Sequence, residues 1–125
     1  MPLITVKTNV KTVSDDFMQK SHDFFKDLLV TEKIIIDLDL GRQMTAFNSS
    51  EPTVTVMGIA VGRFHSDTNP RLHKAIAEFI STALSVPLER TIVFLQKLPC
   101  HNVSAGGEPL PEFLARDRDV TAWQD

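Results

Sequence analysis

The residue with the most distinctive chemistry is Pro2, which directly follows Met1. Removal of Met1 would leave a secondary amine at the start of an apolar segment, and retention of Met1 would block it. A free α-amino group has a pKa of about 7.7–8.0, and burial against apolar side chains lowers this value because it disfavours the charged form. A neutral amine can remove a proton from carbon or attack a carbonyl. Since Met-Pro is also a common way for a chain to start, this single residue leaves a catalytic and an ordinary interpretation open.

The other reactive side chains lack the spacing that catalytic and metal sites require. The four histidines show no metal-ligand spacing, so we expect no metal and no cofactor. They are His22, His65, His73 and His101. Cys100 adjoins His101, but adjacent side chains on an extended chain point to opposite sides and pair poorly. Asp37 and Asp39 share one face of a predicted strand, a pattern more typical of a solvated edge.

Composition excludes several classes of protein. The net charge of −3 provides no basic surface for nucleic acid. The chain has one cysteine and no tyrosine, which rules out an internal disulfide and a catalytic tyrosine. No apolar run approaches the roughly 18 residues of a membrane helix, and the first residues do not resemble a signal peptide. We therefore expect one domain over residues 1–125, located in the cytoplasm, with about 112–125 as a C-terminal extension.

Hydrophobic periodicity predicts four strands and two helices. The strands are expected at Leu3–Asn9, Ile34–Leu40, Thr53–Val61 and Thr91–Leu98. Ser14 is expected to cap the first helix, with Asp15 and Asp16 in its first turn. Asn69 and Pro70 are expected to open the second helix as capping residue and first helical residue. One or two short strands or turns are expected after Pro99.

The elements repeat in the same order in each half of the chain. Pro2 to Val6 resembles Pro52 to Val56, and Glu32 to Ile36 resembles Glu89 to Val93. The pattern predicts two tandem β-α-β units that form a four-stranded mixed sheet with two helices on one face, an α/β (α+β) fold.

Apolar residues are expected on both faces of this sheet, although two helices can cover only one face. On the second face we expect Leu3, Ile35, Ile59, Val93 and Leu95. Exposing such a face costs about 25 cal/mol per Å², and exposed apolar patches indicate interaction surfaces. We therefore expect the sheet to pack against other copies of the chain in a closed homo-oligomer.

Several segments together resemble the macrophage migration inhibitory factor and D-dopachrome tautomerase family. They cover about residues 2–110 and are Met1–Ile4, Ala46–Pro52, Val61–Gly62, Asn69, Leu88–Arg90 and Asn102–Val103. The resemblance implies a homotrimer in which three sheets form a central barrel with the helices outside. It also implies tautomerisation of small aromatic keto or enol compounds such as phenylpyruvate or dopachrome. Some members of the family are secreted without a signal peptide and act as cytokines on a cell-surface receptor.

The resemblance assigns roles to individual residues. Pro2 corresponds to the catalytic N-terminal proline, which acts as general base. Val61 takes the place of an apolar pocket residue, and Arg63 that of a lysine near the pocket. Ile92 and Phe94 stand where the inhibitory factor has a pocket tyrosine and an asparagine.

Other family positions have changed, and these changes affect the expected substrate. The substrate-binding lysine of the family aligns with Val30, and the nearest downstream lysine is Lys33. Thr53 and Val56 replace the Cys-x-x-Cys motif of the inhibitory factor. The pocket is therefore expected to bind anionic keto acids poorly unless Lys33 or Arg63 supplies the missing cation.

Two alternatives to an enzyme remain. The first is a cytokine-like signalling protein of the same fold with little or no catalysis, which the replacement at Val30 favours. The second is a ferredoxin-like module that binds a small ligand, because those domains share the order of strands and helices. An RNA-binding version of that module would need stacking aromatics and a basic face, which this chain does not offer.

Overall fold

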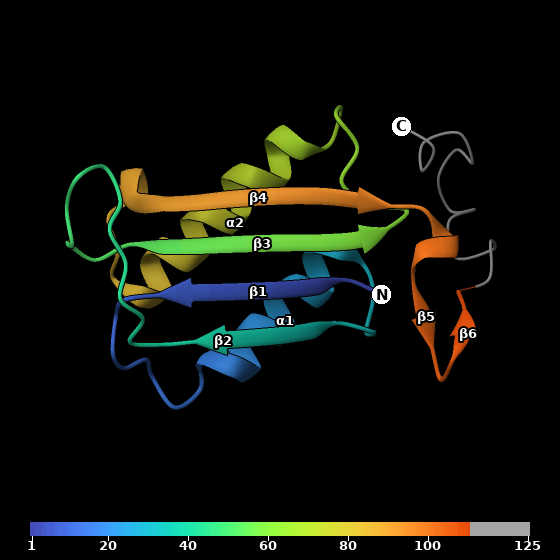
Figure 1. Cartoon of the computed structure of the whole chain (residues 1–125), viewed down its shortest axis with the longest axis horizontal. Helices are drawn as coiled ribbons and strands as arrows, with labels where there is room; N and C mark the ends of the chain where they lie inside the picture. Colours follow the sequence, from blue (N-terminus) through green and yellow to red (C-terminus); the bar gives the residue numbers. More distant parts are fainter. Residues whose placement is uncertain (111–125) are drawn as a thin grey trace.

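The strands form one mixed sheet, and both helices lie on the same side of it (Figure 1). The structure is a computed structural model and describes residues 1–110. Its main elements are β1 (Leu3–Thr8), α1 (Phe17–Leu29), β2 (Ile35–Asp39), β3 (Val54–Val61), α2 (Asn69–Leu84) and β4 (Thr91–Leu98). The short turns η1 (Leu88–Arg90) and η2 (Cys100–Asn102) flank β4, and the hairpin β5 (Ser104–Ala105) and β6 (Glu108–Pro109) follows. The predicted C-terminal extension at about 112–125 lies outside the described residues.

The strand order is β2-β1-β3-β4. β1 is parallel to β2 and β3 is parallel to β4, whereas the central pair β1 and β3 is antiparallel. Each helix therefore joins two neighbouring parallel strands, and the predicted tandem β-α-β repeat is confirmed. In a ferredoxin-like domain the β-α-β units are split, so this pairing rules out that alternative.

Both helices begin differently from the predicted caps. Asp16, not Ser14, is the N-cap of α1, and the Ser14 hydroxyl donates to the Asp16 carboxylate at 2.8 Å. The N-cap of α2 is Thr68, and Asn69 becomes the first helical residue. The Asn69 side-chain amide donates to the Phe64 carbonyl at 3.2 Å, which ties the preceding loop to the helix.

The core lies between the helices and the inner face of the sheet. Its fully buried side chains alternate along the two central strands and face the apolar stripes of α1 and α2. They include Ile4, Val6, Val54, Val56, Phe25, Ile76 and Ile80. The Phe24 and Phe79 rings stack at a centroid separation of 4.1 Å and join the two helices.

The predicted outer face of the sheet was wrong at two residues of β4. Val93 and Leu95 pack against the core beneath the helices, whereas Phe94 is 52% exposed. The four consecutive apolar residues of β4 from Ile92 to Leu95 hide the alternation that normally distinguishes the two faces. The outer face remains apolar, because Met57 on the adjacent β3 is 45% exposed and Ile35 on the far edge strand β2 is 53% exposed.

Gly58 is required where β3 packs most closely. A Cβ atom at this position would lie 3.0 Å from Leu95 Cδ2, 3.2 Å from Phe64 Cζ and 3.4 Å from Ile4 Cδ1. We predict that Gly58→Ala lowers the free energy of unfolding by about 1–2 kcal/mol, because these side chains must shift within a packed core. Urea denaturation would measure this loss, and an unchanged midpoint would contradict it.

Arg90 is a buried cation, 7% exposed, at the end of η1. Its guanidinium donates to the carbonyls of Pro52 at 3.0 Å and of Ser49 and Glu51 at 3.2 Å. It also donates to the Thr53 hydroxyl at 2.5 Å. Arg90 thus holds the loop before β3 against the start of β4.

Candidate active site

The amino end of the chain lies at the edge of the sheet where β3 and β4 end and β2 begins (Figure 1). Pro2 is fully buried, and its carbonyl accepts a hydrogen bond from the Ile35 amide at 3.0 Å. Because Leu3 pairs with Ile59 in the antiparallel register, Pro2 lies beside the last residues of β3. The pairing on both sides fixes the position of the Pro2 ring.

Apolar residues surround this end of the chain. Val61 is 4% exposed and forms a small cluster with the buried Cys100 and Leu110. Met1, Leu98 and Val103 pack against this cluster. The strands explain the grouping, because Val61 pairs with Leu98 in the parallel register of β3 and β4. The chain segments that follow these two strands therefore meet beside the amino terminus.

The terminal amine lies in surroundings that disfavour its protonated form. Burial lowers the pKa of the Met1 amine below its usual 8.0, and the positive charges of Arg63 and then Lys33 lower it further. Cys100 acts weakly in the opposite direction. Lys33, Val61 and Arg63 therefore all lie near the amino end of the chain.

The two cations reach this end from the loops that follow β3 and α1. Gly62 has φ of +69°, a left-handed conformation that glycine adopts without strain, and it turns the chain between Val61 and Arg63. Lys33 lies two residues before β2, where its amide is held by the Thr31 hydroxyl at 3.2 Å. Val30, the position at which the resemblance places the family lysine, is the left-handed C-cap of α1 and is 83% exposed.

One chain does not bring Ile92 and Phe94 to this site. They pair with Thr55 and Met57, so they lie nearer the opposite end of the sheet from Val61. At about 3.3 Å per residue, Ile92 lies roughly 20 Å along the strand from Leu98, the partner of Val61. The predicted role of Ile92 and Phe94 in substrate binding therefore requires a neighbouring copy of the chain.

Sequence reasoning missed the residues that complete the apolar wall. Leu98, Cys100 and Leu110 were not among the expected site residues. The signal was available in the topology, because residues after the end of β4 must lie beside residues after the end of β3 when the two strands are parallel.

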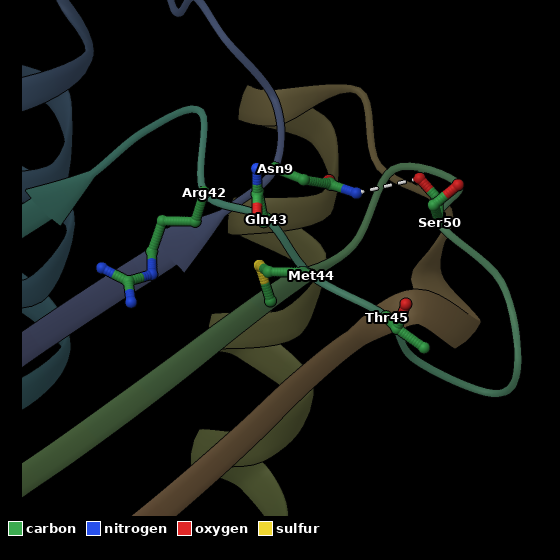
Figure 2. Close-up of a pocket in the computed structure, with 6 residues that line it drawn as sticks. All are labelled: Asn9, Arg42, Gln43, Met44, Thr45 and Ser50. Atoms are coloured by element: carbon green, nitrogen blue, oxygen red, sulfur yellow. Dashed lines mark hydrogen bonds between the residues drawn. The ribbon is translucent and has the colours of Figure 1, made fainter.

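A hollow lies at the opposite end of the sheet (Figure 2) and has a volume of about 580 Å³. Asn9 lines it, but its amide is already engaged by the carbonyls of Ser50 and Glu51 and by the Thr53 amide. Arg42, which points away from the other lining side chains in Figure 2, forms an ion pair with Asp39. These polar groups stabilise the loop, and we assign the hollow no function.

Within residues 1–110, no helix is both long and apolar enough to cross a membrane. Over the same residues, no three histidine, cysteine or acidic side chains are grouped so that they could hold a metal ion.

Comparison with known families gives one match over most of the chain. Residues 1–110 match the family model described as Macrophage migration inhibitory factor (MIF). A sequence search of curated proteins found no match.

Solved structures from several organisms have this fold. The macrophage migration inhibitory factor from Oncomelania hupensis is 23% identical, with a TM-score of 0.87, and the match covers 99% of this chain and 92% of that chain. The protein from Trichinella spiralis is 18% identical, with a TM-score of 0.82 and coverage of 86% and 99%. A homologue from Prochlorococcus marinus is 20% identical, with a TM-score of 0.80 and coverage of 87% and 99%. At these identities the likeness shows the fold alone.

Proposed function

The chain belongs to the macrophage migration inhibitory factor family, and from that premise we propose that it is a tautomerase whose general base is the amine of Pro2, freed by removal of Met1. The observation that supports this proposal is the position of the amino end. Its amine is half-buried near Arg63 and Lys33; burial, and then the positive charges of Arg63 and Lys33, lower the pKa of the terminal amine. Removal of one residue would place the Pro2 nitrogen beside the same groups.

The proposed reaction interconverts a ketone and its enol. The neutral Pro2 amine takes a proton from the carbon beside the carbonyl, and the C–H electron pair forms the enolate. The protonated amine then returns the proton to the oxygen, which restores the neutral base. Arg63 or Lys33 stabilises the negative oxygen of the intermediate, because a fixed cation in an apolar site acts strongly on developing charge.

The substrate we propose is a small aromatic keto acid or its enol. Val61 and the neighbouring apolar cluster would receive the aromatic ring, and the nearby cations would hold the carboxylate. Ile92 and Phe94 of a neighbouring copy would close the pocket on the side that one chain leaves open.

The test combines N-terminal mass analysis with an enolisation assay. Protein that begins at Pro2 should accelerate ketonisation or enolisation of phenylpyruvate, and protein that retains Met1 should not. Processed protein that converts neither phenylpyruvate nor a dopachrome-type compound would overturn the proposal.

The pH dependence of kcat/KM is expected to change when the positive charge of Arg63 is removed. The active form of the base is the neutral amine, so kcat/KM should rise as the pH increases through its pKa and then level off. Because Arg63 lowers the pKa of the terminal amine, Arg63→Met should move this rising limb to higher pH. Arg42→Met, which removes an arginine at the opposite end of the sheet, should leave the limb in place. A limb that does not move in Arg63→Met would contradict this role.

We propose a homotrimer that buries the apolar outer face of the sheet. Phe94→Asp would introduce a charge into that interface, so we expect the variant to sediment as a monomer. Met18→Asp is a matched control, since Met18 is 44% exposed but lies on α1 in the helix layer. A trimer of unchanged stability in Phe94→Asp would contradict this interface.

The exposed Val30 favours a second candidate, a signalling protein that acts on a cell-surface receptor with little catalysis. A valine in place of the substrate-binding cation, 83% exposed, weakens the case for a keto acid substrate. Receptor binding that is retained in Pro2→Gly, together with inactive processed wild-type protein, would support this candidate.

A further inference from the structure

A separate pocket of about 240 Å³ lies between the end of α1 and the start of α2. Five of the seven residues that line it are apolar, among them Leu28, Phe64 and Leu72. The other two lining residues are Arg63 and Arg71, each of which carries a guanidinium group. Among the described residues that line this pocket, none is acidic.

The surroundings of Arg71 add to the positive potential. Arg71 lies in the first turn of α2, at the positive end of the helix dipole. The described residues of that turn include no acidic side chain. Arginine at this end of a helix opposes the helix dipole, so an anion bound between Arg71 and Arg63 would relieve an unfavourable arrangement.

We propose that this pocket binds a small amphiphilic carboxylate, whose charged group lies between Arg63 and Arg71 and whose apolar body packs on Leu28, Phe64 and Leu72. The planar guanidinium fork matches the geometry of a carboxylate. The volume lies below the range of about 300–1,000 Å³ typical of drug-sized ligands, which suits a short aliphatic or single-ring acid.

Arg63 connects this pocket with the candidate active site. The positive charge of Arg63 lowers the pKa of the terminal amine, and Arg63 also lines the pocket between α1 and α2. A carboxylate bound to Arg63 would offset that charge and draw the guanidinium away from the developing oxyanion. Carboxylate binding in this pocket would then lower the rate of turnover. This effect on turnover rests on the proposed function, whereas the binding of the carboxylate does not.

Calorimetric titration of the full-length protein with octanoate tests the binding. Octanoate should bind, whereas octanol, which lacks the charge, and acetate, which lacks the chain, should bind at least about tenfold more weakly. Arg71→Ala should weaken octanoate binding by about tenfold or more. Lys74→Ala, which removes a cation three residues later on α2, should bind as the wild type does.

Arg71→Ala should fold, since it removes a cation from the positive end of a helix, and Arg71→Gln serves as a second variant that preserves much of the side chain. No octanoate binding by the wild type, or full binding in both Arg71 variants, would overturn the proposal. Acetate binding as tight as that of octanoate would overturn the apolar part of it. In the turnover assay, octanoate inhibition should be lost in Arg71→Ala; inhibition that persists there would indicate competition at the Pro2 site instead.

Discussion

Pro2→Gly is expected to lower kcat/KM for phenylpyruvate enolisation by about 100-fold or more, the usual contribution of a positioned general base. Proline presents a rigid secondary amine because its ring locks φ. Glycine would present a primary amine on a freely rotating residue. The measurement is the initial rate for protein whose N-terminus has been verified by mass, with folding checked by circular dichroism.

Two further variants separate loss of the base from loss of the fold. An alanine inserted between Met1 and Pro2 converts the proline nitrogen into an amide, which cannot act as a base, and should reduce activity to a similar extent. Pro70→Gly, at the exposed second residue of α2, should retain activity. Activity close to wild type in the insertion variant would show that the Pro2 amine is not the base.

Arg90→Leu is expected to destabilise the protein by about 3 kcal/mol, because hydrogen bonds to charged groups contribute about 1.5–3 kcal/mol and buried acceptors lose their donor. The carbonyls of Ser49, Glu51 and Pro52 and the Thr53 hydroxyl all accept from this guanidinium. It also lies 5.8 Å from the centre of the Phe47 ring. Thermal denaturation should show a decrease of about 15 °C in Tm.

Arg42→Leu is the matched control for Arg90→Leu. Arg42 forms an ion pair with Asp39, but both side chains are nearly half exposed, and pairs of this kind contribute about 0–1 kcal/mol. The Tm of Arg90→Lys should lie between those of Arg90→Leu and Arg42→Leu, since lysine keeps the charge without the forked geometry. The prediction fails if Arg90→Leu and Arg42→Leu unfold at the same temperature.

Most of the fold could be predicted because its local patterns agree with one another. The strand at Thr91–Leu98 has the predicted limits. β1 and β3 are one residue shorter than predicted at one end, and β2 is one residue shorter at both ends. The sequence could not predict which residues of β4 face the helices, because all four residues from Ile92 to Leu95 are apolar. Only tertiary packing selects Val93 and Leu95 for the side beneath the helices. The helix caps were wrong because Ser14 and Asn69 use their side chains on other partners.

The candidate site was predictable only in part. The resemblance predicted roles for Pro2, Val61 and Arg63, and in the structure these residues lie at one end of the sheet. Cys100 and Leu110 could not be recognised from local sequence, because their position depends on which strand lies beside β3. The role of Arg90 was hidden for a similar reason: its acceptors precede it by 37 to 41 residues.

Each β-α-β unit is preceded by a proline, and the two prolines lie in different surroundings. Pro52 begins the second unit as Pro2 begins the first, but Pro52 is bonded to residues on both sides and its carbonyl accepts from Arg90 at 3.0 Å. Because β1 and β3 are antiparallel, these prolines lie at opposite ends of the sheet. The corner at Pro52 is held in place by this hydrogen bond. At the corner of Pro2 the proposed function requires a different event, the removal of Met1, which would turn the Pro2 nitrogen from an amide into an amine.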